Sequence, residues 1–188
     1  MPVIRAAELH PIIIHFPIAL LLTSVLLDFL AVSFRRSGLA DAATWLLVFG
    51  VPSAAAALLS GVLSERYVTI GAAGDILHYH KVAAVGASGL FGLLLVLRLV
   101  WLAPRLFPMF AGALPAARGA FGVGDAWLRR ALPELYAPRL PRVAIGLYLA
   151  LSLVAVALLA ITGYLGGALV YDHGVGASGF IAAPILAR

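Results

Sequence analysis

Long apolar stretches alternate with short polar segments along the chain. Four of these stretches are nearly free of charged residues, and each has at least the length of about 20 residues with which a helix crosses the hydrocarbon core of a bilayer. Each stretch predicts a transmembrane helix, and four spans place both termini on the same side of the membrane. The predicted spans cover residues 11–34, 44–63, 82–103 and 143–171.

Two short polar segments separate the first three spans. Residues 35–41, RRSGLAD, form the first connection, and residues 64–81, SERYVTIGAAGDILHYHK, contain the Gly, Asp and Ser residues of an ordered loop. Short connections favour antiparallel packing of neighbouring helices. The pattern therefore predicts an all-α fold, an integral membrane four-helix bundle in which residues 1–188 form one membrane domain.

The connection between the third and fourth spans is long and rich in proline. Residues 104–142 contain six prolines, too many for one continuous helix. Its middle, GAFGVGDAWLRRAL, places large apolar side chains near one helical face beside two arginines, which predicts a helix in the membrane surface; a disordered linker is the alternative. The apolar tail, residues 174–188, is too short and too broken by Gly and Pro to span, so we expect it to pack against this protein or a partner.

Composition and charge add an orientation. Hydrophobic residues make up 63% of the chain and charged residues 11%, so lipid is the expected solvent. Nine of the 13 basic residues fall on or toward one side of the predicted spans, and the positive-inside rule assigns that side, with 104–142, to the cytoplasm. We expect a bacterial inner membrane protein with both termini extracytoplasmic. Because the arginines lie between apolar runs, no nucleic-acid site is expected, and no signal-peptide cleavage site follows the N-terminus.

Several kinds of chemistry are excluded by what the chain lacks. It has no Cys, which excludes disulfides, thiolate metal sites, Cys nucleophiles and covalently attached c-type haem. It also has no catalytic triad, phosphate loop or zinc-protease spacing, so we predict no catalytic residues.

The five histidines all fall near the predicted extracytoplasmic face. His10 and His15 begin the first span, His78 and His80 begin the third, and His173 follows the fourth. Histidine is the commonest side-chain ligand of transition metals and binds haem iron through one ring nitrogen. The cluster predicts a haem or metal site; solvated or backbone-bonded histidines at a membrane interface are the alternative.

Helix phase relates two of the histidines to two charged residues. Residues 18 apart lie five turns apart on the same helical face, and this spacing separates His10 from Asp28 and His80 from Arg98. A charge inside the bilayer needs a partner within the bundle. We therefore predict an Asp28–Arg98 ion pair that aligns the first and third spans and puts His10 and His80 at matching depth.

Which histidines pair with one another stays open. His15 lies about 7.5 Å deeper than His10 and about 140° round the helix axis, so it faces a different neighbour. Pairs of His10 with His80 or His15 with His80, and sets that include His173, are all compatible with the pattern. Glycines of the third and fourth spans either admit a flat macrocycle or let helices pack closely: Gly86, Gly89, Gly92, Gly163, Gly166 and Gly167.

The opening HPIIIHFPIALLLTSVLLD, residues 10–28, resembles the bacterial predicted membrane proteins of the domain of unknown function 2231 family. The resemblance covers most of the chain and implies a small four-helix membrane domain. Because relatives are sometimes joined to c-type cytochrome or Rieske iron-sulfur domains, it also implies electron transfer. The long connection 104–142 departs from the compact family pattern. Matching positions are His10, Pro11, His15, Phe16, Pro17, Asp28, His80 and the ending TGYLGGALVYDHGVGA, which contains His173.

We therefore expect a membrane-anchored b-type haem-binding electron-transfer protein, or an accessory subunit of a respiratory or redox membrane complex, rather than an independent enzyme. Two of His10, His15, His80 and His173 would ligate the iron, and electrons would pass between quinol and an extracytoplasmic c-type cytochrome or iron-sulfur carrier. The remaining histidines or Tyr79 would handle protons from quinol.

Two other functions fit the same pattern. The first is a cofactor-free structural subunit of a larger membrane complex. The second is a small transporter or metal-handling protein, in which the histidines form an entry site and Asp28 with Arg98 forms a gate. The transporter ranks last, because the inverted repeats and interrupted helices typical of transporters are not evident in the sequence.

Overall fold

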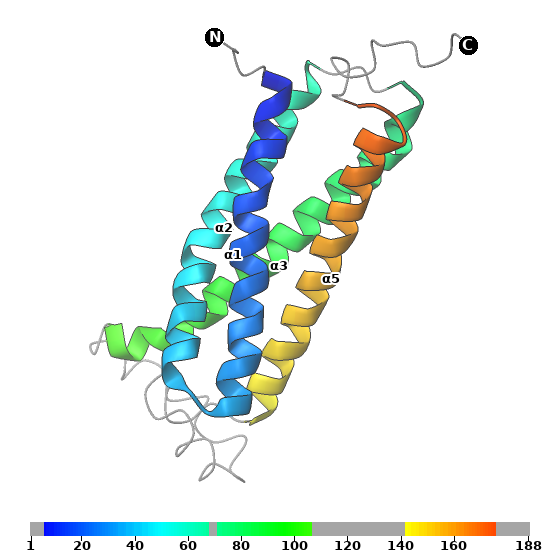
Figure 1. Ribbon diagram of the computed structural model, residues 1–188. Coiled ribbons are helices and arrows are strands. Elements are labelled where there is room, and N and C mark those ends of the chain that lie inside the picture. The colour runs from blue at the N-terminus through cyan, green and yellow to red at the C-terminus, as the bar shows by residue number, and fades with distance from the viewer. Residues whose placement is uncertain (1–5, 68–70, 107–141, 176–188) are drawn as a thin grey trace.

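The regular structure of the chain is helical wherever the computed structural model describes it, over residues 6–67, 71–106 and 142–175. Four long helices alternate in direction (Figure 1): α1 (Ala6–Phe34), α2 (Ser37–Glu65), α3 (Gly74–Leu106) and α5 (Arg142–Tyr171). One turn of 3-10 helix, Gly71–Ala73, precedes α3. These four helices are long and apolar enough to cross a membrane. The predicted all-α membrane four-helix bundle is confirmed.

The helices extend beyond the predicted spans. α2 begins at Ser37 instead of 44, and α3 begins at Gly74 instead of 82. The prediction of a loop over 64–81 is therefore wrong for its second half, which forms the first two turns of α3. Hydropathy marks only the segment inside the hydrocarbon, whereas helical hydrogen bonding continues into the polar ends. Asp75 assists it there, because a negative charge is favourable at the N-terminal end of the helix dipole.

The long predicted connection is shorter than expected at both ends. α3 continues through Pro104 to Leu106, and α5 begins at Arg142. The segment 107–141, which contains the predicted surface helix, lies outside the described residues, as does 176–188, most of the predicted tail. Both proposals about these segments stay predictions.

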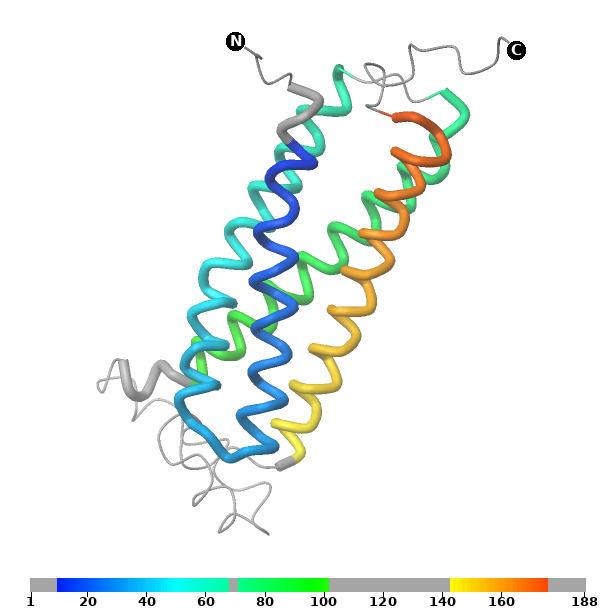
Figure 2. The backbone as a smooth tube through the Cα atoms, viewed as in Figure 1, coloured from blue at the N-terminus to red at the C-terminus, as the bar shows by residue number. Residues whose placement is uncertain are grey.

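The helices pack as two pairs. α1 lies along α2 and α3 lies along α5, while α3 runs obliquely from beside α5 toward α2 (Figures 1 and 2). The turn between α1 and α2 is tight, because Arg35 adopts a φ of 56° and the Arg36 N–H donates a 3.1 Å hydrogen bond to the Ala31 carbonyl. Since α1 and α3 begin and α5 ends at the same end of the bundle, that end carries all five histidines; we call it the histidine end.

The apolar core occupies the middle of the bundle and continues away from the histidine end. Buried members include Leu21 of α1 and Phe91 of α3, which belong to the same apolar cluster. Large apolar side chains are exposed on every long helix, an arrangement that suits lipid and not water. Exposed tyrosines toward the histidine end match the aromatic belt found where membrane proteins meet the interface: Tyr67, Tyr79, Tyr164 and Tyr171.

Gly50 of α2 provides a test of the α1–α2 packing. A methyl group at this position would lie 2.7 Å from Cδ2 of buried Leu21, so Gly50→Ala must displace a core side chain. We expect it to lower the free energy of unfolding by about 1–3 kcal/mol, measured as a lower midpoint of thermal unfolding in detergent. At Gly38 a methyl group would meet nothing within 4 Å, so Gly38→Ala is the control. Equal midpoints for the two variants would contradict this packing.

Candidate functional site

Two of the five histidines face each other between the two helix pairs. His10 of α1 and His80 of α3 have ring centroids 6.5 Å apart, and their ring planes cross at 89°. Both side chains are half-buried. Among the pairings that the sequence left open, the structure brings together His10 and His80.

The ring of His10 is held by α2. Its Nδ1–H donates to the Ala57 carbonyl at 3.0 Å and also lies 3.0 Å from the Ser60 hydroxyl oxygen. The Ser60 hydroxyl itself donates to the Ala57 carbonyl at 2.8 Å. A carbonyl can only accept, so Nδ1 carries a proton, and Nε2 has a lone pair whenever the ring is neutral. The ring packs on Gly61, where a methyl group would lie 3.1 Å from its Cε1.

The ring of His80 is held by α5 in the same way. Its Nδ1–H donates to the Thr162 carbonyl at 3.0 Å, which again leaves Nε2 with its lone pair. This ring packs on Gly166, where a methyl group would lie 3.2 Å from its Cε1. Each helix pair therefore presents one oriented imidazole with a free electron pair.

The other three histidines are exposed. His15 donates from Nδ1 to the Pro11 carbonyl of its own helix at 2.7 Å, and His78 has its ring 5.8 Å from that of neighbouring Tyr79. His173 follows the end of α5. Over residues 6–67, 71–106 and 142–175, no group of three or more His, Cys, Asp or Glu side chains gathers as around a metal ion. Within the described residues, the candidate site therefore offers two protein nitrogens to a ligand, Nε2 of His10 and Nε2 of His80.

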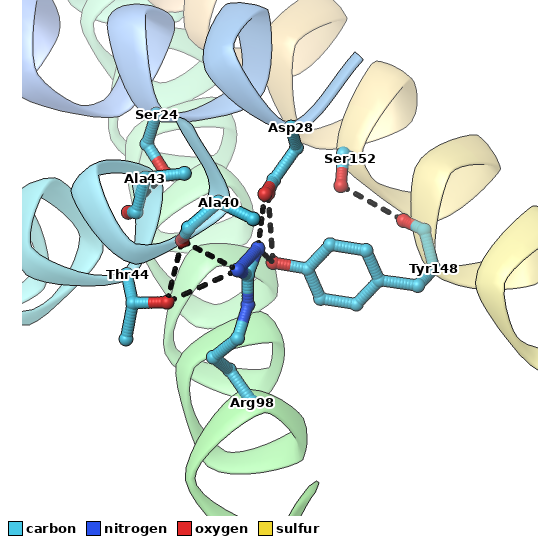
Figure 3. Close-up of polar contacts among 8 residues, drawn as sticks. All are labelled: Ser24, Asp28, Ala40, Ala43, Thr44, Arg98, Tyr148 and Ser152. Atoms are coloured by element: carbon cyan, nitrogen blue, oxygen red, sulfur yellow. Dashed lines mark hydrogen bonds and ion pairs between the residues drawn. The ribbon is translucent and has the colours of Figure 1, made fainter. Parts of the chain in front are cut away.

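The predicted ion pair is present in the structure. Asp28 and Arg98 are both 1% exposed, and the Arg98 guanidinium donates directly to the Asp28 carboxylate (Figure 3). The Tyr148 hydroxyl of α5 lies 3.2 Å from the guanidinium and donates to the other carboxylate oxygen at 3.3 Å. Two opposite charges and a hydroxyl therefore satisfy one another inside the bundle.

The second helix completes this polar cluster. Arg98 donates to the Ala40 carbonyl at 3.3 Å and to the Thr44 hydroxyl at 3.1 Å, both on α2. Figure 3 shows the guanidinium between α1, α2 and α5. The cluster of Asp28, Arg98, Thr44 and Tyr148 therefore joins all four long helices.

The histidine pair and the polar cluster are separated by most of a membrane. Asp28 follows His10 by 18 residues and Arg98 follows His80 by 18 residues, a rise of about 27 Å along each helix. A hydrocarbon core is about 30 Å thick. The histidine pair consequently lies near one surface and the polar cluster near the other.

Sequence reasoning missed the partners that hold the rings. The Ala57 and Thr162 acceptors are backbone carbonyls, which leave no signal in the identity of a residue. Gly61 was not named as a candidate. A glycine on a span that packs beside a span with a histidine is a signal that could have identified it. Gly166 was named among the candidate glycines, whereas a methyl group at Gly89 or Gly163 would meet nothing within 4 Å.

A comparison with protein families gives one match. The model of the family described as predicted membrane protein, domain of unknown function 2231, matches residues 6–179. The chain belongs to this family. No curated protein and no solved structure matches the chain. Membership in the domain of unknown function 2231 family agrees with the multi-pass membrane fold.

The polar cluster gives a prediction about stability. Asp28→Ala leaves the Arg98 charge buried without its carboxylate, so we expect a loss of about 3–5 kcal/mol in the free energy of unfolding and a much lower folded yield. The double variant Asp28→Leu with Arg98→Leu removes both charges and should recover most of that yield. Folded protein is measured by gel filtration in detergent. Equal folded yields of the single and double variants would show that the buried Arg98 charge does not need the Asp28 carboxylate.

Proposed function

We propose that this chain is a membrane-anchored b-type haem protein that transfers electrons, with His10 and His80 as the two axial ligands of one haem. The observation that carries the proposal is a pair of imidazoles, on two different helices, whose Nδ1 atoms both lie 3.0 Å from backbone carbonyls. Nε2 is the nitrogen left to bind a metal in each ring. The two rings face each other between the helix pairs.

The separation of the rings fits one metal ion between them. A metal–imidazole bond is about 2 Å long and the ring centroid lies roughly 1 Å behind the nitrogen, so two imidazoles on opposite sides of one metal have centroids about 6 Å apart. The centroids of His10 and His80 are 6.5 Å apart. The glycines beneath the rings, Gly61 and Gly166, leave the space that each imidazole occupies beside its partner helix.

The number of ligands favours haem over a bare metal ion. A structural zinc ion takes four protein ligands, whereas the porphyrin supplies four nitrogens of its own and leaves two axial positions for the protein. Two opposed histidines match that requirement. When bound, a haem with two axial histidines supplies one-electron transfer between ferrous and ferric iron.

The chain's own residues set the conditions for this chemistry. The hydrogen bonds from Nδ1 to the Ala57 and Thr162 carbonyls fix the tautomers and raise the basicity of Nε2. The apolar helices and the surrounding lipid exclude water, which tunes the reduction potential. Exposed His15 and Tyr79 lie near the two ligands in sequence and provide groups that take up protons from a quinol.

The charge distribution supports the proposed orientation. Nine of the 13 basic residues fall on or toward the side of the α1–α2 turn, which contains Arg35 and Arg36. The histidine end carries Arg66 and Lys81, and Lys81 is paired with Glu65 at 2.7 Å. By the positive-inside rule, this distribution favours the histidine pair at the extracytoplasmic face of a bacterial inner membrane. One haem near one face does not carry electrons across about 30 Å of hydrocarbon alone, so the partners are quinol, other subunits of a redox complex and an extracytoplasmic c-type cytochrome or iron-sulfur carrier.

Haem binding is tested by the dithionite-reduced minus air-oxidised spectrum and by pyridine haemochrome analysis of the full chain purified in detergent. We expect a b-type α-band with close to one haem per chain. His10→Ala and His80→Ala should each abolish that band, because each removes one axial ligand. His15→Ala and His173→Ala are the controls and should retain it. A colourless wild-type protein, made with ample haem, would favour the cofactor-free structural subunit instead.

Orientation is tested by fusing alkaline phosphatase, which is active only outside the cytoplasm, at two positions. A fusion after residue 118, between α3 and α5, should be inactive. A fusion after Tyr67, at the histidine end, should be active, with expression of both fusions checked by immunoblot. The reverse pattern would place the histidine pair at the cytoplasmic face.

A further inference from the structure

The two histidines are held by one device that occurs in both helix pairs. In the first pair, His10 of α1 donates to the carbonyl of Ala57 and packs on Gly61, four residues later on α2. In the second pair, His80 of α3 donates to the carbonyl of Thr162 and packs on Gly166, again four residues later, on α5. Four residues place the glycine one turn beyond the carbonyl on the same helical face.

The similarity between the two helix pairs extends to further positions along the helices. A shift of 70 residues superimposes His10 on His80 (80 − 10) and Asp28 on Arg98 (98 − 28). A shift of 105 residues superimposes Ala57 on Thr162 (162 − 57) and Gly61 on Gly166 (166 − 61). Under the same shifts, six pairs of buried positions coincide, while other buried positions such as Val25 and Ala54 fall on half-buried ones: Leu21 with Phe91, Ser24 with Leu94, Ala40 with Ile145, Ala43 with Tyr148, Leu47 with Ser152 and Gly50 with Ala155.

Helix periodicity alone does not produce this register. Stripes of buried residues on two helices coincide at any shift of seven residues, because seven residues make about two turns. The histidine, the charged residue, the carbonyl and the glycine give four further matches, and these select one shift for each helix. α1 with α2 and α3 with α5 are therefore two versions of the same hairpin, arranged with their histidines facing each other.

We propose that Gly61 and Gly166 are equivalent positioning residues that, with the Ala57 and Thr162 carbonyls, hold the two imidazole planes crossed at the metal site. The proposal rests on the haem function above. A methyl group at Gly61 would lie 3.1 Å from Cε1 and 3.3 Å from Nδ1 of His10, and one at Gly166 would lie 3.2 Å and 3.5 Å from the same atoms of His80. Either methyl group comes closest to Cε1, the carbon between the two ring nitrogens, so the ring turns or shifts away from it.

The angle between axial imidazoles has a spectroscopic signature. In low-spin ferric haem, crossed imidazole planes give an electron paramagnetic resonance (EPR) spectrum dominated by one highly anisotropic low-field feature, and nearly parallel planes give three resolved features. The 89° crossing of the His10 and His80 rings predicts the first kind of spectrum for the oxidised wild-type protein. A residue that served packing alone would change stability and leave this signature in place.

The experiment compares four alanine variants of the full chain in detergent. Gly61→Ala and Gly166→Ala should each convert the anisotropic EPR signal to a rhombic one or reduce haem content several-fold. Gly163→Ala and Gly167→Ala are matched controls on α5, because a methyl group would meet nothing within 4 Å at the first and only the Tyr171 ring at 4.0 Å at the second. Wild-type signal and haem content in both Gly61→Ala and Gly166→Ala would overturn the proposal.

A second measurement reads the tautomers of the rings without haem. Nitrogen-15 NMR of histidine-labelled wild-type protein, produced without haem, reports the tautomer of each ring. The Nδ1 proton of exposed His15 should exchange quickly, whereas two other rings should carry a hydrogen-bonded Nδ1 proton that exchanges slowly. These two signals should be missing from His10→Ala and His80→Ala respectively. An Nε2-protonated His10 or His80 would overturn the positioning role. A colourless wild-type protein would count against the haem function alone, because the tautomers are still read.

Discussion

The ion pair between Asp28 and Arg98 is the constraint on which the rest of the structure depends. Two charges cannot remain separated inside a bilayer without a large cost in solvation free energy, so α1 and α3 must bring these side chains to the same depth. Once they do, the residues 18 positions earlier, His10 and His80, also share a depth. Tyr148 and Thr44 extend the constraint to the other two helices. A contact near one membrane surface thereby sets the register of a site near the other.

Much of this arrangement follows from the sequence. The four spans are evident from hydropathy, and the phase of a helix relates Asp28 to His10 and Arg98 to His80 without any knowledge of tertiary structure. The cost of a buried charge then selects Arg98 as the partner of Asp28, and the structure contains that contact. Three general physical rules, namely hydropathy, helix phase and the cost of a buried charge, therefore predict two histidines at equal depth.

Other features of the site could not be predicted from residue identity. Equal depth did not decide between His10 and His15 as the partner of His80, because that choice depends on how far each helix is rotated about its axis. The structure shows His15 turned outward onto its own backbone and His10 turned toward α2. The acceptors are carbonyls of Ala57 and Thr162, and every residue has a carbonyl. Helix ends were also missed, because the first turns of α3 are polar and helical at once.

The repeated hairpin explains why two unlike ends coexist in one bundle. At the histidine end the two equivalent positions are alike, and they are the two histidines proposed to bind one haem. At the other end the equivalent positions carry opposite charges, Asp28 and Arg98, which attract each other and hold the pairs together. One end of the membrane domain thus fixes the fold, and the other carries the proposed haem site.

The most direct test of this account is near-infrared magnetic circular dichroism of the oxidised wild-type protein, because the charge-transfer band in that region identifies the two axial ligands of a low-spin haem. The account predicts the band of two imidazole ligands, arising from His10 and His80. A haem with any other ligand pair, or a protein that binds no haem, would contradict it.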